Sequence, residues 1–394
     1  MLPDLGPLAA EPDRLFQQVA QTLVERGEFH RLFDLRLIQE RRRLGLPLDR
    51  RTPIDDVEEP LRSQLETGYL AACREVGELL LEAGRLREAW MYLRPAGDKL
   101  ALRQRLAKVV LDDDRADELI ELALFEAVDA ERGYAWLLGR NGTCNAITTL
   151  DGMSTQLGTA DLKACAAVLV RHVYRELHGN LRGHLHRLKS EAPTDLSVVE
   201  LIDQHPELLA DGSYHLDVSH LASTMRYARL LTERSLVEKA LEMAEYGSRL
   251  PKDLQYAGEA PFEEQFPTHR LLLDATLGRN VDAALSYFAG RASAATTDDD
   301  TAPLSTTAVE TYLILLQRAG RHAEALSAYA ELVPKGRELS PHAPTLLELA
   351  AASGEWDRYE AICRDREDLI GYAAGVVARA SDASKKTNSP VPSP

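Results

Sequence analysis

Residues 309–337, VETYLILLQRAGRHAEALSAYAELVPKGR, decide how this chain folds, because they have the features of two helices joined by a short turn. Gly320 stands at the turn, where the backbone needs a residue that tolerates a positive φ. Ala325 follows five residues later, and helices approach each other closely only where a side chain is small. Tyr329 lies on the second helix and Pro334 near its end. The stretch therefore predicts a helical hairpin.

This hairpin resembles the tetratricopeptide-type unit, which has small residues where its helices cross and an aromatic residue on the second helix. Gly354 follows Gly320 by 34 residues, the period of that family, although its hairpin has Tyr359 where alanine is expected. The same spacings recur, less evenly, in three other sets: Gly278, Ala283 and Tyr287; Ser235, Ala240 and Ala244; and Gly77, Gly84, Ala89 and Ala96. The resemblance covers residues 223–366 and one hairpin at 66–96. It implies an all-α fold of stacked antiparallel hairpins, a TPR-like α-solenoid, with insertions near 251–267 and 293–305. An irregular helical bundle is the alternative.

The composition agrees with an all-α chain. Of the 394 residues, 45% are apolar, with Leu and Ala supplying much of that fraction, and only 6% are aromatic. Leu and Ala favour helices, whereas strands favour β-branched and aromatic residues. We expect a helical region at 1–140 with one repeat-like hairpin, a central helical region at 141–222 with His-rich segments, a repeat region at 223–380 and a disordered tail at 381–394. Within these regions, 139–152 (GRNGTCNAITTLDG) is expected to be a loop.

The charge balance disfavours binding to nucleic acid. Acidic residues outnumber basic ones by 62 to 46, for a net charge of −16, and such a field repels phosphates. The densest basic cluster, Arg41 to Arg43, is expected to be the solvated end of a helix. The acidic balance favours a protein or peptide partner that carries basic segments.

The chain is expected to be cytoplasmic, without membrane insertion. Its start, MLPDLGPLAAEPDRL, lacks the basic and apolar regions of a signal peptide, and no apolar run approaches the length of a membrane span. The four cysteines are scattered without a CxxC pair, so we expect neither a disulfide framework nor a zinc knuckle.

The segment SYHLDVSHLASTMRYAR, residues 213–229, contains the strongest candidate for a metal site. His215, Asp217 and His220 fall within six residues at the start of a helix, and imidazole with carboxylate suits zinc, iron or manganese. The alternative is that Asp217 or Ser219 caps the helix and the histidines pack locally. The four histidines at 172, 178, 184 and 186 have spacings that do not build a metal site and are expected to be structural.

Cys144, in the expected loop, is a weak candidate for a nucleophile. A thiolate needs a nearby base or a helix N-terminus to form at neutral pH, and a histidine from 215–220 would have to come within reach. A glycine-punctuated turn with a small, half-buried cysteine is the alternative.

Two functions from different classes fit these patterns, beside a purely architectural subunit of a larger assembly, which the sequence does not rank against the first. The first is a protein- or peptide-binding scaffold that needs no cofactor, with a candidate surface on the repeat region at Tyr227, Arg229, Arg234, Tyr312, Gln317 and Arg318. The second is a metal-dependent or cysteine-dependent enzyme with its site in residues 141–226, which would use a divalent metal. The first is favoured, because no phosphate-binding loop, nucleophile elbow or HExxH motif occurs in the sequence.

Overall fold

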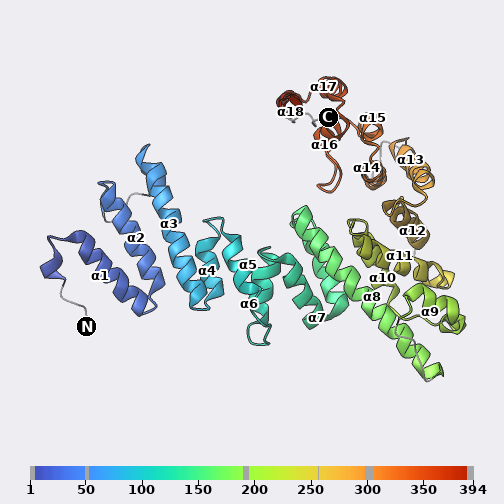
Figure 1. Cartoon of the computed structure of the whole chain (residues 1–394), viewed down its shortest axis with the longest axis horizontal. Coiled ribbons are helices and arrows are strands. Elements are labelled where there is room, and N and C mark those ends of the chain that lie inside the picture. Colours follow the sequence, from blue (N-terminus) through green and yellow to red (C-terminus); the bar gives the residue numbers. More distant parts are fainter. Residues whose placement is uncertain (1–4, 49–52, 190–194, 256, 298–305, 388–394) are drawn as a thin grey trace, which may run out of the picture. The chain divides into compact units, whose positions relative to one another are not determined.

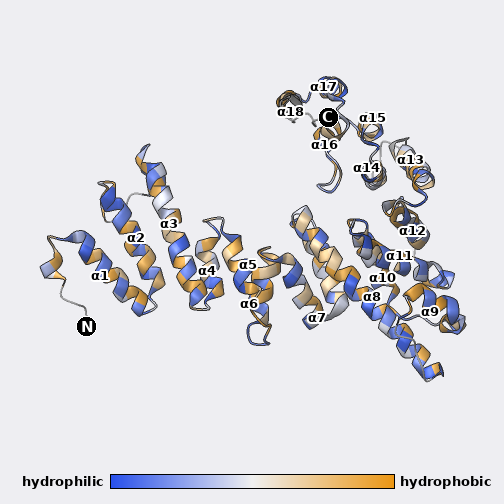
Figure 2. Cartoon of the chain, viewed as in Figure 1, coloured by the Kyte–Doolittle hydropathy of each residue, from blue (hydrophilic) through white to orange (hydrophobic). Residues whose placement is uncertain are grey.

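The computed structural model describes residues 5–48, 53–189, 195–255, 257–297 and 306–387. The chain divides into two compact units, Met1–Arg140 and Asn141–Pro394. Throughout the described residues the protein is all-α, without a β-strand and with one isolated bridge between Ala257 and Glu264. The all-α class predicted from composition is confirmed. Figure 2 shows hydrophilic and hydrophobic residues mixed along the helices, as expected for helices that bury one face and expose the other.

The N-terminal unit is a row of helices in which each of the first five packs against its neighbours in sequence (Figure 1). They are α1 (Pro12–Glu25), α2 (Phe29–Arg43), α3 (Leu61–Glu82), α4 (Leu86–Leu93) and α5 (Lys99–Leu106), followed by α6 (Ala116–Ile120), a π-helical turn (Glu121–Phe125) and the first part of α7 (Ala130–Met153). Their shared core is formed mainly by leucines, with Phe29 and Trp90.

A close helix crossing joins α3 and α4, the pair that contains the predicted hairpin at 66–96. A Cβ atom added to Gly77 would lie 2.6 Å from Cδ2 and Cγ of Leu93, a side chain that is fully buried. Gly84 forms the turn with a φ of 72°. The crossing of the two helices therefore requires a small residue at position 77, and the turn favours glycine at position 84.

The loop expected at 139–152 is instead a helix. α7 runs from Ala130 to Met153 and is interrupted only by a kink at Gly142, where φ is 77° and ψ is 169°. Beyond the kink, Ala146, Ile147 and Leu150 are buried and hold this part of α7 in place. The polar composition of the segment concealed that helical spacing.

The C-terminal unit contains α8 (Thr159–Lys189), α9 (Val198–Gln204), α10 (Val218–Ala228), α11 (Arg234–Ser248), α12 (Gln265–Thr276), α13 (Val281–Thr297), α14 (Thr307–Arg318), α15 (His322–Leu332), α16 (Leu346–Ser353), α17 (Trp356–Asp365) and α18 (Leu369–Thr387), with short 3-10 turns at Pro206–Gly212 and Lys252–Leu254. From α10 to α18, each helix packs against the next. The long α8 packs against α9, α10 and α11.

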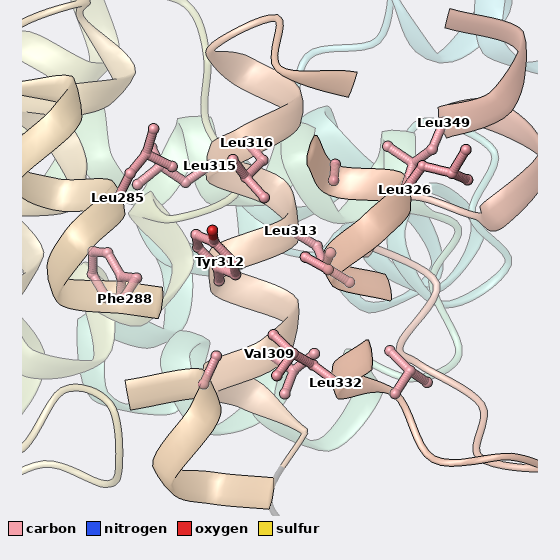
Figure 3. Packing of buried hydrophobic residues seen from close by; sticks show 14 of the residues in the cluster. Leu285, Phe288, Val309, Tyr312, Leu313, Leu315, Leu316, Leu326, Leu332 and Leu349 are labelled. Carbon is pink, nitrogen blue, oxygen red and sulfur yellow. The ribbon is translucent and has the colours of Figure 1, made fainter. Parts of the chain in front are cut away.

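A large apolar core of the C-terminal unit lies between α12 and α17. Figure 3 shows Leu285 and Phe288 of α13 facing α14, whose Leu313 faces α15. This arrangement, in which one helix contributes side chains to the cores on both of its sides, is typical of stacked helices.

Glycines end three of the helices in this unit at the expected turns. Gly278, Gly320 and Gly354 have φ values of 80°, 72° and 76°, which are the left-handed conformations that favour glycine. The hairpin turn predicted at residue 320 is confirmed, since α14 ends at Arg318 and α15 begins at His322.

The C-terminal end differs from the expected tail, because α18 continues past Ser381 to Thr387. The remaining expected tail residues, 388–394, lie outside the described residues. Among the helices that are described, none is both long and apolar enough to cross a membrane.

Candidate binding cavity

A cavity of about 570 Å³ lies within the C-terminal unit. Four separate segments line it: the end of α7 with the turn into α8, the end of α10, one face of α14 and the loop before α16. The lining residues are Asp151, Ser154, Thr155, Leu157, Leu162, Arg226, Tyr227, Arg229, Leu230, Thr307, Glu310, Thr311, Ile314, Ser340, Pro341 and His342. This volume is within the range of sites that hold a small molecule or a few side chains, about 300–1,000 Å³.

Asp151 on α7 is the first of two carboxylates in the wall, and its charge is neutralised locally. Nη2 of Arg226 lies 3.0 Å from Oδ2, and the hydroxyl of Tyr227 donates to Oδ1 at 2.5 Å. Burial raises the pKa of Tyr227, and the hydrogen bond to Asp151 raises it further. These contacts join the end of α10 to α7.

Glu310 on α14 is the second carboxylate, and it fixes the loop before α16. It accepts hydrogen bonds from the backbone N–H of Ser340 at 2.9 Å, from the Ser340 hydroxyl at 2.7 Å and from the Thr306 hydroxyl at 2.8 Å. The Thr159 hydroxyl donates to the carbonyl oxygen of Pro341 at 3.2 Å. The loop wall of the cavity is therefore anchored to both α8 and α14.

Arg229, which directly follows α10, supplies a positive charge to the cavity wall. Its Nε donates to the carbonyl oxygen of Arg226 at 3.0 Å, and its guanidinium lies 4.5 Å from the centroid of the Phe262 ring. In the described part of the chain, no carboxylate forms an ion pair with it, and its two Nη atoms have no hydrogen-bond partner. Burial, and then the nearby charge of Arg226, lower the pKa of Arg229 to about 10, while the charges of Glu259 and Glu310 act in the opposite direction. Arg229 therefore remains charged at neutral pH.

Arg318 of α14 forms a hydrogen bond to the backbone of Arg229. Its Nη2 donates to the carbonyl oxygen of Arg229 at 2.6 Å, and its Nη1 donates to the Thr276 hydroxyl at 2.9 Å. Burial lowers the pKa of Arg318 to about 10. Both partners are neutral oxygens, so this arginine adds a second positive charge beside the cavity.

His342 completes the polar wall as a neutral group. Its Nδ1 is buried and has no hydrogen-bond partner among the described residues. Burial lowers the pKa of this imidazole, and the charge of Lys163 lowers it further. The ring therefore contributes no positive charge near neutral pH.

The three residues proposed as metal ligands have separate partners. Nε2 of His215 lies 2.9 Å from Nδ1 of His184, and its Nδ1 lies 3.2 Å from the Tyr246 hydroxyl. Burial lowers the pKa of His215 to about 4. Asp217 caps α10 by accepting a hydrogen bond from the backbone N–H of Ser219 at 2.8 Å.

The carbonyl oxygen of His220, rather than its ring, accepts a hydrogen bond from the Thr224 hydroxyl at 2.7 Å. Across the described parts of the chain, no group of three or more His, Cys, Asp or Glu side chains is placed to hold a metal ion. The arrangement around Asp217 corresponds to the capping alternative.

Cys144 lies on α7 just beyond the kink and is exposed. In the described residues, no hydrogen bond joins its thiol to a histidine. Its neighbour Thr143 instead lies near α8, with its hydroxyl 3.1 Å from Nε2 of His172 and 3.3 Å from Oε2 of Glu176.

The surface residues suggested from sequence fall into two groups. Tyr227 and Arg229 line the cavity, and Arg318 contacts Arg229. Tyr312 is 9% exposed and belongs to the core, Arg234 pairs with Glu238 on the surface, and Gln317 is half-buried away from the cavity lining.

Sequence reasoning did not identify Asp151, Arg226, Glu310 or His342 as site residues. Arg226 could have been identified from the sequence, since it lies in the same MRYAR segment as Tyr227 and Arg229. The sequence around the other three residues contains no recognisable motif, because these residues come together only when distant segments pack against one another.

No protein-family model matches this chain, and no match was found among curated proteins.

Proposed function

We propose that this protein is a TPR-like helical-repeat scaffold that binds a protein or peptide segment, and that the cavity of the C-terminal unit is where the segment is anchored. The observation that carries the proposal is the cavity itself. It is a recess of about 570 Å³ whose polar walls are held by internal hydrogen bonds. Preorganised walls lower the cost of ordering side chains when a ligand binds.

The titratable groups of the cavity favour binding over proton-transfer chemistry. General acids and bases work best when their pKa lies near the operating pH. Here the pKa of Tyr227 is raised, that of His342 is lowered and that of Arg229 is about 10, so all three are moved or held away from neutrality. Asp151 is in addition occupied by Arg226 and Tyr227.

The packing of the helices supports the repeat architecture within this proposal. From α10 to α18 each helix packs against the next, and α10, α12 and α14 also contact one another in turn. Gly247 of α11 allows a close approach, since an added Cβ would lie 2.5 Å from the ring of Phe266 on α12. In TPR-like arrays such stacking leaves a long surface for a partner.

The partner that we propose is cytoplasmic and carries basic segments, which the net charge of −16 attracts to the protein as a whole.

A displayed-peptide library selected on the full chain tests the proposal. Binders are then measured against Thr155→Trp, which places an indole at the cavity wall from an exposed position. The matched control is Gln156→Trp, an equally exposed neighbour that does not line the cavity. We expect Thr155→Trp to weaken binding by at least about tenfold, a loss typical of an interface anchor, and Gln156→Trp to leave it unchanged. Binders that ignore Thr155→Trp would contradict the proposal.

A further inference from the structure

We propose that the anchoring group in this cavity is a carboxylate carried on an apolar body, and that Arg229 receives it. This inference rests on the proposed function, because it names the chemistry of the group that enters the cavity. It is carried by the guanidinium of Arg229, which lines the cavity in a fixed orientation and whose Nη atoms have no hydrogen-bond partner among the described residues.

The charged groups of the wall differ in the partners that they contact directly. The carboxylate of Asp151 is matched by Arg226 and Tyr227. The carboxylate of Glu310 accepts three hydrogen bonds from neutral donors. Among the described residues Arg229 has no carboxylate at ion-pair distance, although the charges of Glu259 and Glu310 act on it from farther away. The neighbouring Arg318 donates only to neutral oxygens. The Nη donors of Arg229 are therefore available to an acceptor that enters the cavity.

The position of Arg229 fits a planar anion. Its Nε is held by the carbonyl oxygen of Arg226 and its face by the ring of Phe262, so the orientation of the guanidinium is fixed. The Nη atoms remain free to donate, and Arg229 lines the cavity. Arginine binds carboxylates through two parallel N–H···O hydrogen bonds, which an immobilised guanidinium forms at little further entropic cost.

The remaining wall selects against a highly charged anion. Asp151 and Glu310 both line the cavity, and they repel a phosphate dianion more strongly than a monoanion. Five apolar residues complete the lining: Leu157, Leu162, Leu230, Ile314 and Pro341. They favour a ligand with an apolar body of a few carbon atoms. Such a carboxylate occurs in an acidic side chain flanked by apolar residues and in a free small organic acid.

The test uses 4-methylpentanoate and its neutral amide, 4-methylpentanamide, titrated into the full chain. The readout is the Arg229 Nε–H resonance in a nitrogen-proton correlation spectrum, assigned by its loss in Arg229→Gln. We expect the acid to shift this resonance and to bind at least about tenfold more tightly than the amide, as for the loss of a charge-assisted pair. Equal binding of acid and amide would overturn the inference, and so would tighter binding of inorganic phosphate than of the acid.

Variants localise the effect. Arg229→Gln should abolish the preference for the acid. Arg229→Lys keeps the charge but loses the two parallel N–H donors of the guanidinium, and should retain part of the preference. The control is Arg279→Gln, a half-exposed arginine 3.6 Å from Asp274 that does not line the cavity. An unchanged preference in Arg229→Gln would count against the site. The comparison of acid and amide on the unaltered chain keeps the test decisive even where a variant folds poorly.

Capped peptides separate the two sources of the carboxylate. Acetyl-Leu-Glu-Leu-amide is compared with its glutamine counterpart, beside the free acid. Preference for the glutamate peptide assigns the carboxylate to a side chain, and binding of the free acid alone would support the inference while removing support for a peptide-binding function. Library peptides that respond to Thr155→Trp but not to Arg229→Gln would leave the scaffold function in place and overturn this inference.

Discussion

Replacing Gly77 by alanine tests whether α3 and α4 need a small residue at their crossing. The new Cβ would lie 2.6 Å from Cδ2 and Cγ of Leu93, closer than carbon atoms can approach. Leu93 is fully buried within the core of the N-terminal unit, so its side chain has no free space to occupy. The substitution therefore forces the two helices apart or moves Leu93 away from its preferred rotamer.

Two opposing effects set the size of the change. Alanine favours a helix over glycine by about 0.5–1 kcal/mol. Overpacking a well-packed core costs about 1–3 kcal/mol. Because Leu93 cannot move into solvent, we expect the second effect to win, with a net loss of about 1–2 kcal/mol in the free energy of unfolding. Gly139→Ala is the matched control, since this helical glycine of α7 is exposed and nothing lies within 4 Å of the added Cβ. That change should stabilise the chain by about 0.5–1 kcal/mol.

Urea denaturation followed by far-UV circular dichroism measures both variants, and hydrogen exchange of α3 and α4 localises the effect. A double-mutant cycle with Leu93→Ala sharpens the test. That substitution alone should cost about 2–5 kcal/mol, but it removes both atoms that crowd position 77. Adding Gly77→Ala to Leu93→Ala should then be neutral or stabilising. Equal stability of Gly77→Ala and Gly139→Ala would refute the reasoning.

Four further outcomes follow from other contacts. The protein should lose up to about 3 kcal/mol of stability as the pH falls from 6.5 to 4. The reason is that His215 stays neutral down to about pH 4 in the folded protein, whereas in the unfolded chain it takes up a proton near its ordinary pKa of 6.5. Urea midpoints across this pH range, compared with those of His215→Gln, measure the contribution of this residue. Asp217→Ala removes the cap of α10 and should cost about 1 kcal/mol in a thermal melt. Arg366→Met leaves the carbonyl oxygen of Val333, now 2.6 Å from Nη2, without its donor, and should speed hydrogen exchange at the end of α15. Ellman's reagent should titrate one thiol in the native protein and none in Cys144→Ser, because Cys144 is exposed and the other three cysteines are buried.

The helices could be predicted wherever apolar spacing and glycine turns agreed, as around Gly320. The prediction failed at 139–152, where glycine, asparagine and threonine suggested a loop. In the structure the polar side chains bond back along the helix: Thr148 and Thr149 donate to the carbonyl oxygens of Cys144 and Asn145. Such bonds let polar residues remain helical. The buried Ala146, Ile147 and Leu150 carried the correct spacing.

The cavity could be predicted only in part. Tyr227 and Arg229 were identified as part of a candidate binding surface on the repeat region. Asp151, Glu310 and His342 could not be identified, since they acquire their role only when distant segments pack together. Tyr312 is the opposite case, a residue that the sequence placed at the site but the structure does not. It was expected on the binding surface, but it lies on α14 in the core shared with α13 and α15 (Figure 3).

The most direct test of the account is a crystal structure of the full chain with the tightest peptide from the library selection. We predict that the peptide occupies the cavity between α10 and α14, with a carboxylate of an acidic side chain bound by Nη1 and Nη2 of Arg229 and an apolar neighbour against Leu230 and Ile314. A peptide bound elsewhere on the chain, with no carboxylate at Nη1 and Nη2 of Arg229, would contradict the account.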